Sequence, residues 1–194
     1  MTKIHDREQV IDAAAKVFAA KGFEAARLEE IAAELGVLKG SLYYHAASKA
    51  ELLFLVTHRR MLTIIEQTQT IAASDASPAE KLAAAMRAHL HHLDEHHPES
   101  SLWFVQPSRS GKSADRQAEI RALHREYEAV LRGIVQEGIE SGDFYRDLDA
   151  AVATLGVLGM CNWLPRWYDR GGRLSIDEIG DTFIGMVLEG LRSV

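Results

Sequence analysis

Residues 22–53 read GFEAARLEEIAAELGVLKGSLYYHAASKAELL, and this stretch decides the fold. Its first half carries one apolar stripe at helical spacing, formed by Leu28, Ile31, Ala32 and Leu35. Gly36 stands where this helix must stop and the chain must turn, a position that often needs a positive φ. A second short helix follows, carrying Lys39, Ser41, Tyr43, Tyr44 and His45. The order helix, glycine turn, helix predicts a helix-turn-helix whose second helix enters the major groove of DNA.

The rest of the chain also has helical periodicity, and no segment alternates apolar and polar residues as a strand would. We therefore expect an all-α fold of about nine helices, one of them a short segment at residues 98–107. We expect a three-helix head at residues 4–64, with the helix-turn-helix motif at about 27–46, and a helical body at residues 65–194. Capping boxes are expected at Ser48–Glu51, Ser77–Glu80 and Ser175–Glu178, a helix cap at Asp149, and a helix kink at Pro165.

Charge and cysteine content indicate where such a protein works. Lys and Arg outnumber Asp and Glu by nine to eight in residues 1–60 and are outnumbered 13 to 20 in the rest. A mildly basic head on an acidic body fits a first segment that meets phosphate. The single Cys161 suits a reducing compartment, the first residues show no secretory signal, and the longest apolar run, residues 150–161, is too short to span a bilayer. We expect a cytoplasmic protein that does not enter the membrane.

The motif residues resemble the TetR family of one-component transcriptional regulators over roughly residues 5–60. The resemblance rests on the helix pattern before Gly22, on the ordered set from Leu28 to Val37, and on GSLYYH at residues 40–45 followed by residues 48–52. It implies a homodimeric repressor that binds a palindromic double-stranded DNA operator and leaves it when a small molecule occupies the body. By position, DNA contacts would fall on Lys39, Gly40, Ser41, Tyr43, Tyr44, His45 and Lys49.

The residues themselves agree with several of these contacts. Lys49 would present a cation beside the free N–H groups of a helix N-terminus, a seat for phosphate. Lys39 reaches toward a guanine edge, and Gly40 removes a side chain where the helix approaches DNA. Tyr43 as a core aromatic is an equal alternative.

Three positions depart from the family pattern. Leu38 replaces a hydroxyl residue that caps the second helix, which costs about 1 kcal/mol, although it can contact a thymine methyl. Ala46 replaces an aromatic side chain, so we expect looser packing of the head. Arg27, in place of a hydroxyl residue, is expected to contact phosphate. These changes bear on operator affinity and leave the expected fold unaltered.

The body carries a second candidate site at CNWLPRWY, residues 161–168. Its aromatic and cationic side chains suit an anionic or planar ligand, and packing alone is the equal alternative. The segment is similar to the C-terminal domains of TetR-type regulators that sense acyl-CoA thioesters. The candidate ligand-binding residues are Trp103, Phe104, Arg125, Tyr127, Trp163, Arg166 and Trp167. We expect the last two long helices to form the dimer interface, where Gly156 and Gly159 allow close approach.

Other readings of the chain remain open at this stage. The run of histidines from His89 to His97 places His92 and His96 on one helix face, a spacing that is compatible with a metal site. A polar helix face is the preferred interpretation. An inward-facing His89, His92 or His96 could still hydrogen-bond a ligand. Cys161 reads as a small core residue rather than a redox switch. No catalytic motif occurs, and we expect no catalytic residue, metal or cofactor. The rivals to a ligand-released repressor are a constitutive DNA-binding protein and a His-rich metal-dependent enzyme.

Overall fold

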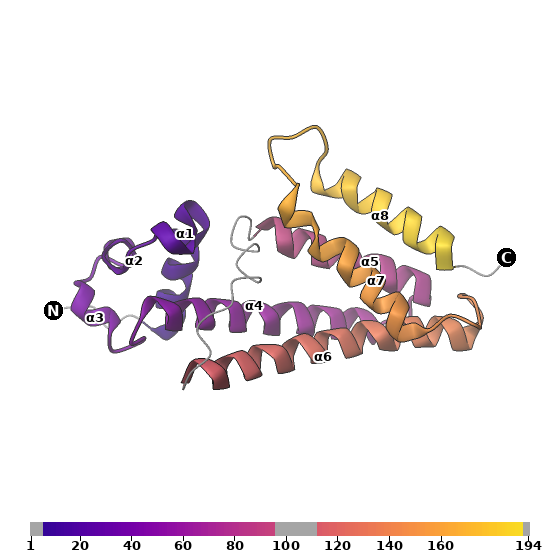
Figure 1. The fold of residues 1–194 in the computed structure, drawn as a ribbon, viewed down its shortest axis with the longest axis horizontal. Coiled ribbons are helices and arrows are strands. Elements are labelled where there is room, and N and C mark those ends of the chain that lie inside the picture. Colours follow the sequence, from indigo (N-terminus) through magenta and orange to yellow (C-terminus); the bar gives the residue numbers. More distant parts are fainter. Residues whose placement is uncertain (1–5, 96–111, 192–194) are drawn as a thin grey trace. The chain divides into compact units, whose positions relative to one another are not determined.

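A computed structural model describes residues 6–95 and 112–191, and every regular element in these residues is helical (Figure 1). The elements are α1 (Arg7–Ala25), α2 (Leu28–Glu34), α3 (Lys39–Leu42), α4 (Lys49–Ala72), α5 (Pro78–Glu95), α6 (Lys112–Ser141), α7 (Ala150–Asn162), the 3-10 turn η2 (Leu164–Arg166) and α8 (Ile176–Leu191). The predicted all-α fold is confirmed. Eight α-helices form within the described residues, against the expected nine or so, and the segment predicted at 98–107 lies outside them.

The chain divides into two compact units. The described parts of the first, here called the head, are residues 6–61 and 112–120, and those of the second, the body, are residues 62–95 and 121–191. The divisions fall inside α4, after Met61, and inside α6, after Ile120. The start of α6 thus belongs to the head, which the sequence pattern does not indicate.

The head is built around one apolar core that α1, α2, α3 and the start of α4 share. The apolar stripe predicted on α2 faces this core, with Ile31 and Ala32 buried and Leu28 and Leu35 packed against it. Each of the other helices contributes at least one side chain that is no more than 2% exposed, namely Phe18, Leu42, Leu52 and Val56. Burial of these side chains fixes α3, which is too short to be stable alone.

Most of the predicted helix caps are confirmed. Glu80 and Ser77, and likewise Glu178 and Ser175, exchange the two hydrogen bonds of a capping box. The carboxylate of Asp149 accepts from the N–H groups of Ala151 and Val152 at 2.9 and 3.0 Å. At Ser48 only half of the capping box forms: the N–H of Glu51 donates to the Ser48 hydroxyl at 3.1 Å. The carboxylate of Glu51 accepts from the N–H of Ala47 at 2.8 Å, one residue before Ser48.

The kink predicted at Pro165 is wrong, because α7 ends before that residue. The helix stops at Asn162, and Pro165 lies in the 3-10 turn η2. Proline lacks an N–H and is tolerated in the first turn of a helical segment, so the chain begins a new turn instead of bending the old one.

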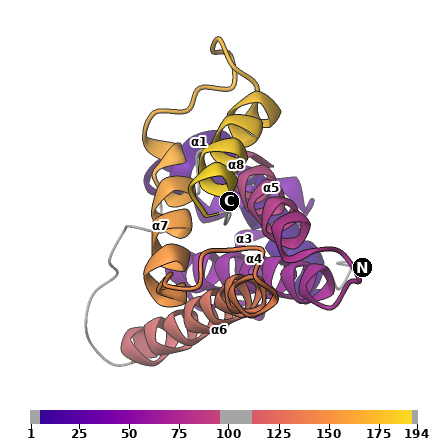
Figure 2. The same cartoon turned by 90° about the vertical axis from the view of Figure 1, so that its right-hand side faces the viewer.

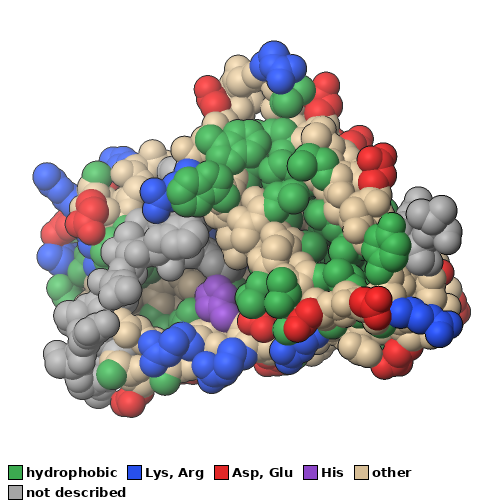
Figure 3. Space-filling model, turned by 45° about the vertical axis from the view of Figure 1, so that its right-hand side comes forward, with side chains coloured by type: hydrophobic (Ala, Val, Ile, Leu, Met, Phe, Trp, Pro, Cys, Tyr) green, Lys and Arg blue, Asp and Glu red, His purple; other side chains and the backbone are tan. Residues whose placement is uncertain are grey.

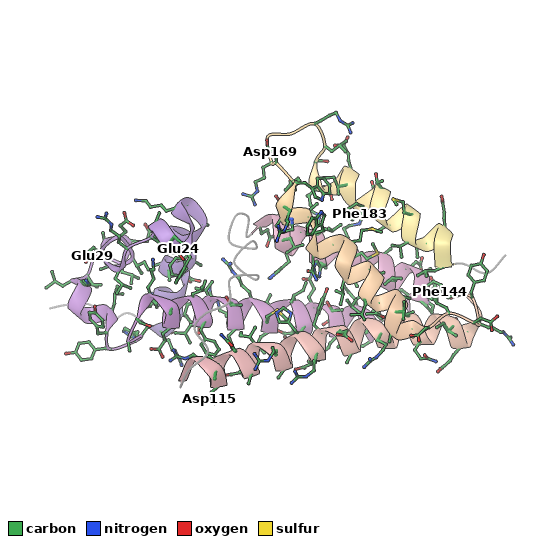
Figure 4. The ribbon with its side chains drawn as sticks, viewed as in Figure 1. Glu24, Glu29, Asp115, Phe144, Asp169 and Phe183 are labelled. Atoms are coloured by element: carbon green, nitrogen blue, oxygen red, sulfur yellow. The ribbon has the colours of Figure 1, made fainter. Side chains whose placement is uncertain are left out.

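In the body, α5 packs against α7, η2 and α8 (Figures 1 and 2). The ring of Phe144, just beyond α6, is fully buried and lies directly against Gly138, where any side chain would overlap it (Figure 4). Among the described residues, no helix is both long and apolar enough to cross a membrane.

Candidate DNA-binding and ligand-binding sites

The turn between α2 and α3 has the geometry that its glycine predicts. Gly36 has a φ of +67°, the left-handed region that favours glycine. The N–H groups of Gly36 and Val37 donate to Ala33 and Ala32 at 3.0 and 2.9 Å, which satisfies the last carbonyls of α2. The two helices of the motif are thereby set at a sharp turn, as the sequence predicted.

The recognition helix α3 is shorter than expected. It ends at Leu42, and Tyr43, Tyr44 and His45 lie in the turn that follows, where the N–H of His45 donates to Leu42 at 2.9 Å. Leu38 occupies the N-cap position without a side-chain hydrogen bond, because leucine has no acceptor. α3 is thus a single helical turn that contains a glycine and has no side-chain cap.

The outward side of α3 and the following turn, here called the recognition face, is aromatic and basic. Tyr44 is 91% exposed, Leu38 80% and Tyr43 51%, so Tyr43 is not a core residue. Lys39 and Gly40 are exposed, and Ser41 and His45 are half-buried. The recognition face is thus available to a partner, while Leu42 anchors it from beneath.

Two ion pairs join lysines to carboxylates of α2, and one of them includes the candidate DNA contact Lys39. Nζ of Lys39 lies 2.7 Å from Oε1 of Glu29, and Nζ of Lys21 lies 2.6 Å from Oε1 of Glu30. The hydrogen bond between Lys39 and Glu29 raises the pKa of the ammonium and lowers that of the carboxylate. Lys39 is therefore charged and oriented in the free protein, and a contact with a guanine edge would replace this exposed pair.

Arg27, Ala46 and Lys49 frame the motif at its base. Arg27 is exposed beside the N-terminus of α2, where Glu30 accepts from its backbone N–H at 3.0 Å. Ala46 is buried in the head core, where the family pattern has a larger aromatic side chain. Lys49 donates three hydrogen bonds to backbone carbonyls at 2.7 to 3.1 Å, so the phosphate contact predicted for it would require at least one of these bonds to open.

The body contains a buried polar cluster where α5, α6 and α7 meet. Nδ1 of His89 lies 2.7 Å from the hydroxyl of Tyr127, and Nε2 lies 3.1 Å from Oδ1 of Asn162. Because Oδ1 only accepts, Nε2 carries the proton and Nδ1 accepts from Tyr127. Burial lowers the pKa of His89 to about 4 and raises that of Tyr127. The cluster is neutral, and it is fully hydrogen-bonded around the imidazole.

Of the other predicted ligand-binding residues, three lie at or beside η2 and one lies on α6. Trp163 and Arg166 lie at η2, with the guanidinium carbon 4.8 Å above the indole ring, and the Trp167 ring meets Phe183 of α8 edge-on at 6.3 Å (Figure 4). All three side chains are exposed, as is Arg125 on α6. Trp103 and Phe104 lie outside the described residues.

The histidine run and Cys161 are the other two features that the sequence singled out. Within residues 6–95 and 112–191, no three metal-ligating side chains gather; His96 and His97 lie outside this part of the chain. Cys161 is buried, and burial raises the pKa of its thiol to about 12, which keeps it unreactive.

The sequence pattern did not indicate Asn162, and it offered His89 only as one of three histidines available to a ligand. His89 follows Leu82 and Met86 on the buried stripe of α5, so its inward direction is readable from the spacing. Nothing in the local pattern singles out Asn162, because its partner lies 73 residues away.

A helix-turn-helix with an exposed aromatic and basic recognition face defines a DNA-binding protein, and the helical body adds a separate unit for other contacts. The family model for bacterial regulatory proteins of the tetR family matches residues 10–56, and that for the tetracyclin repressor-like C-terminal domain matches residues 75–191. The chain belongs to the TetR family of transcriptional regulators, as the motif predicted.

Named relatives and solved structures extend the similarity over almost the whole chain. The HTH-type transcriptional repressor KstR2 of Mycobacterium tuberculosis is 28% identical over 185 residues, which cover 95% of this chain and 92% of the relative. A TetR/AcrR-family regulator from Thermobifida fusca YX-ER1 is 32% identical with a TM-score of 0.81, covering 96% of this chain and 98% of that one. AibR, solved with isovaleryl coenzyme A and operator DNA, is 26% identical with a TM-score of 0.75, covering 93% and 96%. These homologues are transcriptional regulators.

Proposed function

We propose that the protein is a homodimeric repressor that binds a palindromic operator and releases it when an acyl-CoA thioester binds the body. The recognition face carries this proposal, since a buried Leu42 holds an exposed tyrosine and lysine surface on a helix-turn-helix. The residues proposed to contact DNA are Arg27, Leu38, Lys39, Gly40, Ser41, Tyr43, Tyr44 and His45. KstR2 is a repressor, and AibR binds both operator DNA and an acyl-CoA.

Two features of the body favour an acyl-CoA effector. The guanidinium of Arg166 lies over one face of the Trp163 ring, and this cation and aromatic plane suit a phosphate and a nucleobase. Tyr127 and His89 form a neutral hydrogen-bonding pair among apolar neighbours, and a thioester carbonyl could accept from one of them by taking the place of its present acceptor. Release requires that the effector bind one conformer of the dimer more tightly than the other.

A titration of operator-bound protein tests the effector class. Isovaleryl-CoA, longer straight-chain acyl-CoA thioesters, free CoA and the free acids are added to labelled operator complex, and release is followed by fluorescence anisotropy. We expect acyl-CoA to release DNA and free acids to have no effect. Arg166→Met should raise the half-releasing acyl-CoA concentration about 10-fold or more, the effect of losing about 1.4 kcal/mol from a charged contact. Release by none of the thioesters at saturation would instead favour a constitutive DNA-binding protein.

Gly40 offers a test of the DNA-facing side. A Cβ at this position meets no protein atom within 4 Å, and alanine is favoured over glycine in a helix by about 1 kcal/mol. Gly40→Ala should therefore keep or raise the unfolding temperature while weakening operator binding about 10-fold, because the added methyl group occupies the space that DNA approaches.

The matched control for this variant is Gly133→Ala, at an exposed glycine of α6 that also has open space around it. It should leave operator affinity unchanged. Operator binding by Gly40→Ala as tight as that of the wild-type protein would remove this residue from the proposed DNA interface.

A further inference from the structure

Lys49, the first residue of α4, is half-buried and has its ammonium hydrogen-bonded to the end of α1. Nζ donates to the carbonyl oxygens of Phe23 at 2.7 Å, Glu24 at 3.1 Å and Ala26 at 3.0 Å. The same nitrogen lies 4.5 Å above the centre of the Phe23 ring. A lysine ammonium has three N–H donors, so these bonds use all of them.

The carbonyls that receive Lys49 are those that the end of a helix leaves without a partner. Gly22 has a φ of +74°, which turns the chain out of the helical path near the end of α1. The negative end of the α1 dipole adds to the attraction for a cation at this place. Three oxygens converging on one point suit a compact ammonium, whereas a planar guanidinium cannot place three donors on one point.

The position of these bonds along the chain gives them a consequence for the motif. Ala26 is followed by Arg27, where the helix-turn-helix begins, and Lys49 follows the loop that leaves α3. One side chain thus ties together both ends of residues 27–48, which hold α2 and α3. The loop before Lys49 is held as well, because the carboxylate of Glu51 accepts from the N–H of Ala47 at 2.8 Å.

We propose that Lys49 is a positioning residue: it closes residues 27–48 at their base and sets the direction of the recognition face instead of contacting phosphate. The inference rests on the proposed function, since it concerns how the operator is recognised. It predicts that operator affinity depends on the three hydrogen bonds that the ammonium donates and not on its positive charge alone.

Two substitutions separate geometry from charge. Lys49→Met keeps the apolar stem, and Lys49→Arg keeps the charge while losing the three-carbonyl fit. Each is titrated with the selected operator and with a scrambled duplex of the same length, between about 50 and 200 mM salt. We expect both variants to lose about 10-fold or more in operator affinity, with unchanged affinity for the scrambled duplex and an unchanged salt slope, because base contacts are misdirected while phosphate contacts persist.

The opposite pattern would overturn the proposal. A phosphate contact predicts that Lys49→Arg behaves as wild type and that Lys49→Met lowers the salt slope by about 1 on both duplexes. Lys21→Met is the control, because Lys21 is a nearby exposed lysine whose ammonium pairs with a carboxylate. Circular dichroism of each variant shows whether the head has stayed folded.

A measurement on the wild-type protein needs no folded variant. Reductive methylation followed by mass spectrometry reports how accessible each lysine ammonium is, and Lys16, with its side chain 71% exposed, provides the reference. We expect Lys49 to be methylated far more slowly than Lys16 both with and without operator. Ready methylation of Lys49 in the free protein with protection only on DNA would contradict the proposal. Failure of the wild-type protein to select any DNA would contradict the proposed function separately.

Discussion

Replacing Leu155 with glutamate is expected to convert the dimer into a monomer and to weaken operator binding by roughly 100-fold or more, since two linked half-site contacts gain that much from effective concentration. TetR regulators are dimeric, and we propose α7 and α8 as the interface. Figure 3 shows hydrophobic side chains gathered over these helices. Val152 is 66% exposed and Leu155 54%, and the neighbouring Gly156 and Gly159 have open space around them. A charge buried at such a face has no partner in a symmetric dimer.

Sedimentation velocity at several protein concentrations measures this outcome, and anisotropy with the operator measures the loss of binding. Leu62→Glu is the matched control, because Leu62 is an exposed leucine on α4. It should leave both the dimer and operator affinity unchanged. A Leu155→Glu protein that sediments as the wild-type dimer would show that the interface lies elsewhere.

Acid is expected to destabilise the body because His89 is buried in its neutral form. Its pKa is about 4 in the folded protein against 6.5 for an ordinary histidine, and burial is the main cause. Between these two pH values the unfolded chain binds more protons than the folded one, so the free energy of unfolding falls as the pH falls. The contribution of neutral His89 to the free energy of unfolding is fully present above pH 6.5 and is lost as the pH falls toward 4. The whole contribution is about 3 kcal/mol. Burial lowers the pKa of His124 as well, which adds in the same direction.

Urea unfolding at pH 7.5 and pH 5 checks this prediction. His89→Gln should be less stable than wild type at pH 7.5, because the hydrogen bonds to Tyr127 and Asn162 are disturbed, and its stability should fall less on acidification. His91→Gln, at a half-buried histidine of the same helix, is the control for replacing an imidazole on α5. The assignment to His89 is wrong if its variant and wild type lose the same free energy between the two pH values.

The parts of the fold that the sequence predicted are those governed by local rules. Gly36 predicted a positive φ, and Ser77 with Glu80 predicted a helix start. The stripe that contains Ile31 and Ala32 predicted the buried face of α2. Each of these depends on residues within one or two helical turns. Local chemistry therefore sufficed for the turn of the helix-turn-helix, for most helix starts and for the family.

The predictions that failed or were missing depend on distant partners. The sequence does not show which side of α7 is exposed, where Val152 and Leu155 lie, because that helix is apolar on nearly every side and its period does not tell inside from outside. The bond between His89 and Asn162 joins residues far apart in sequence. Lys49 reads as an exposed cation at a helix start, and only the folded chain brings it to the carbonyls of α1.

Selection of binding sites from a random pool of duplex DNA, with the purified dimer, tests the central claim most directly. We predict enrichment of a single palindrome whose half-sites lie about one helical turn apart, or a multiple of that distance, since two recognition helices must enter major grooves on one side of the duplex. Tyr44→Ala should reduce the enrichment at defined base pairs of each half-site. Recovery of no sequence above the starting pool would contradict the account of this protein as an operator-binding repressor.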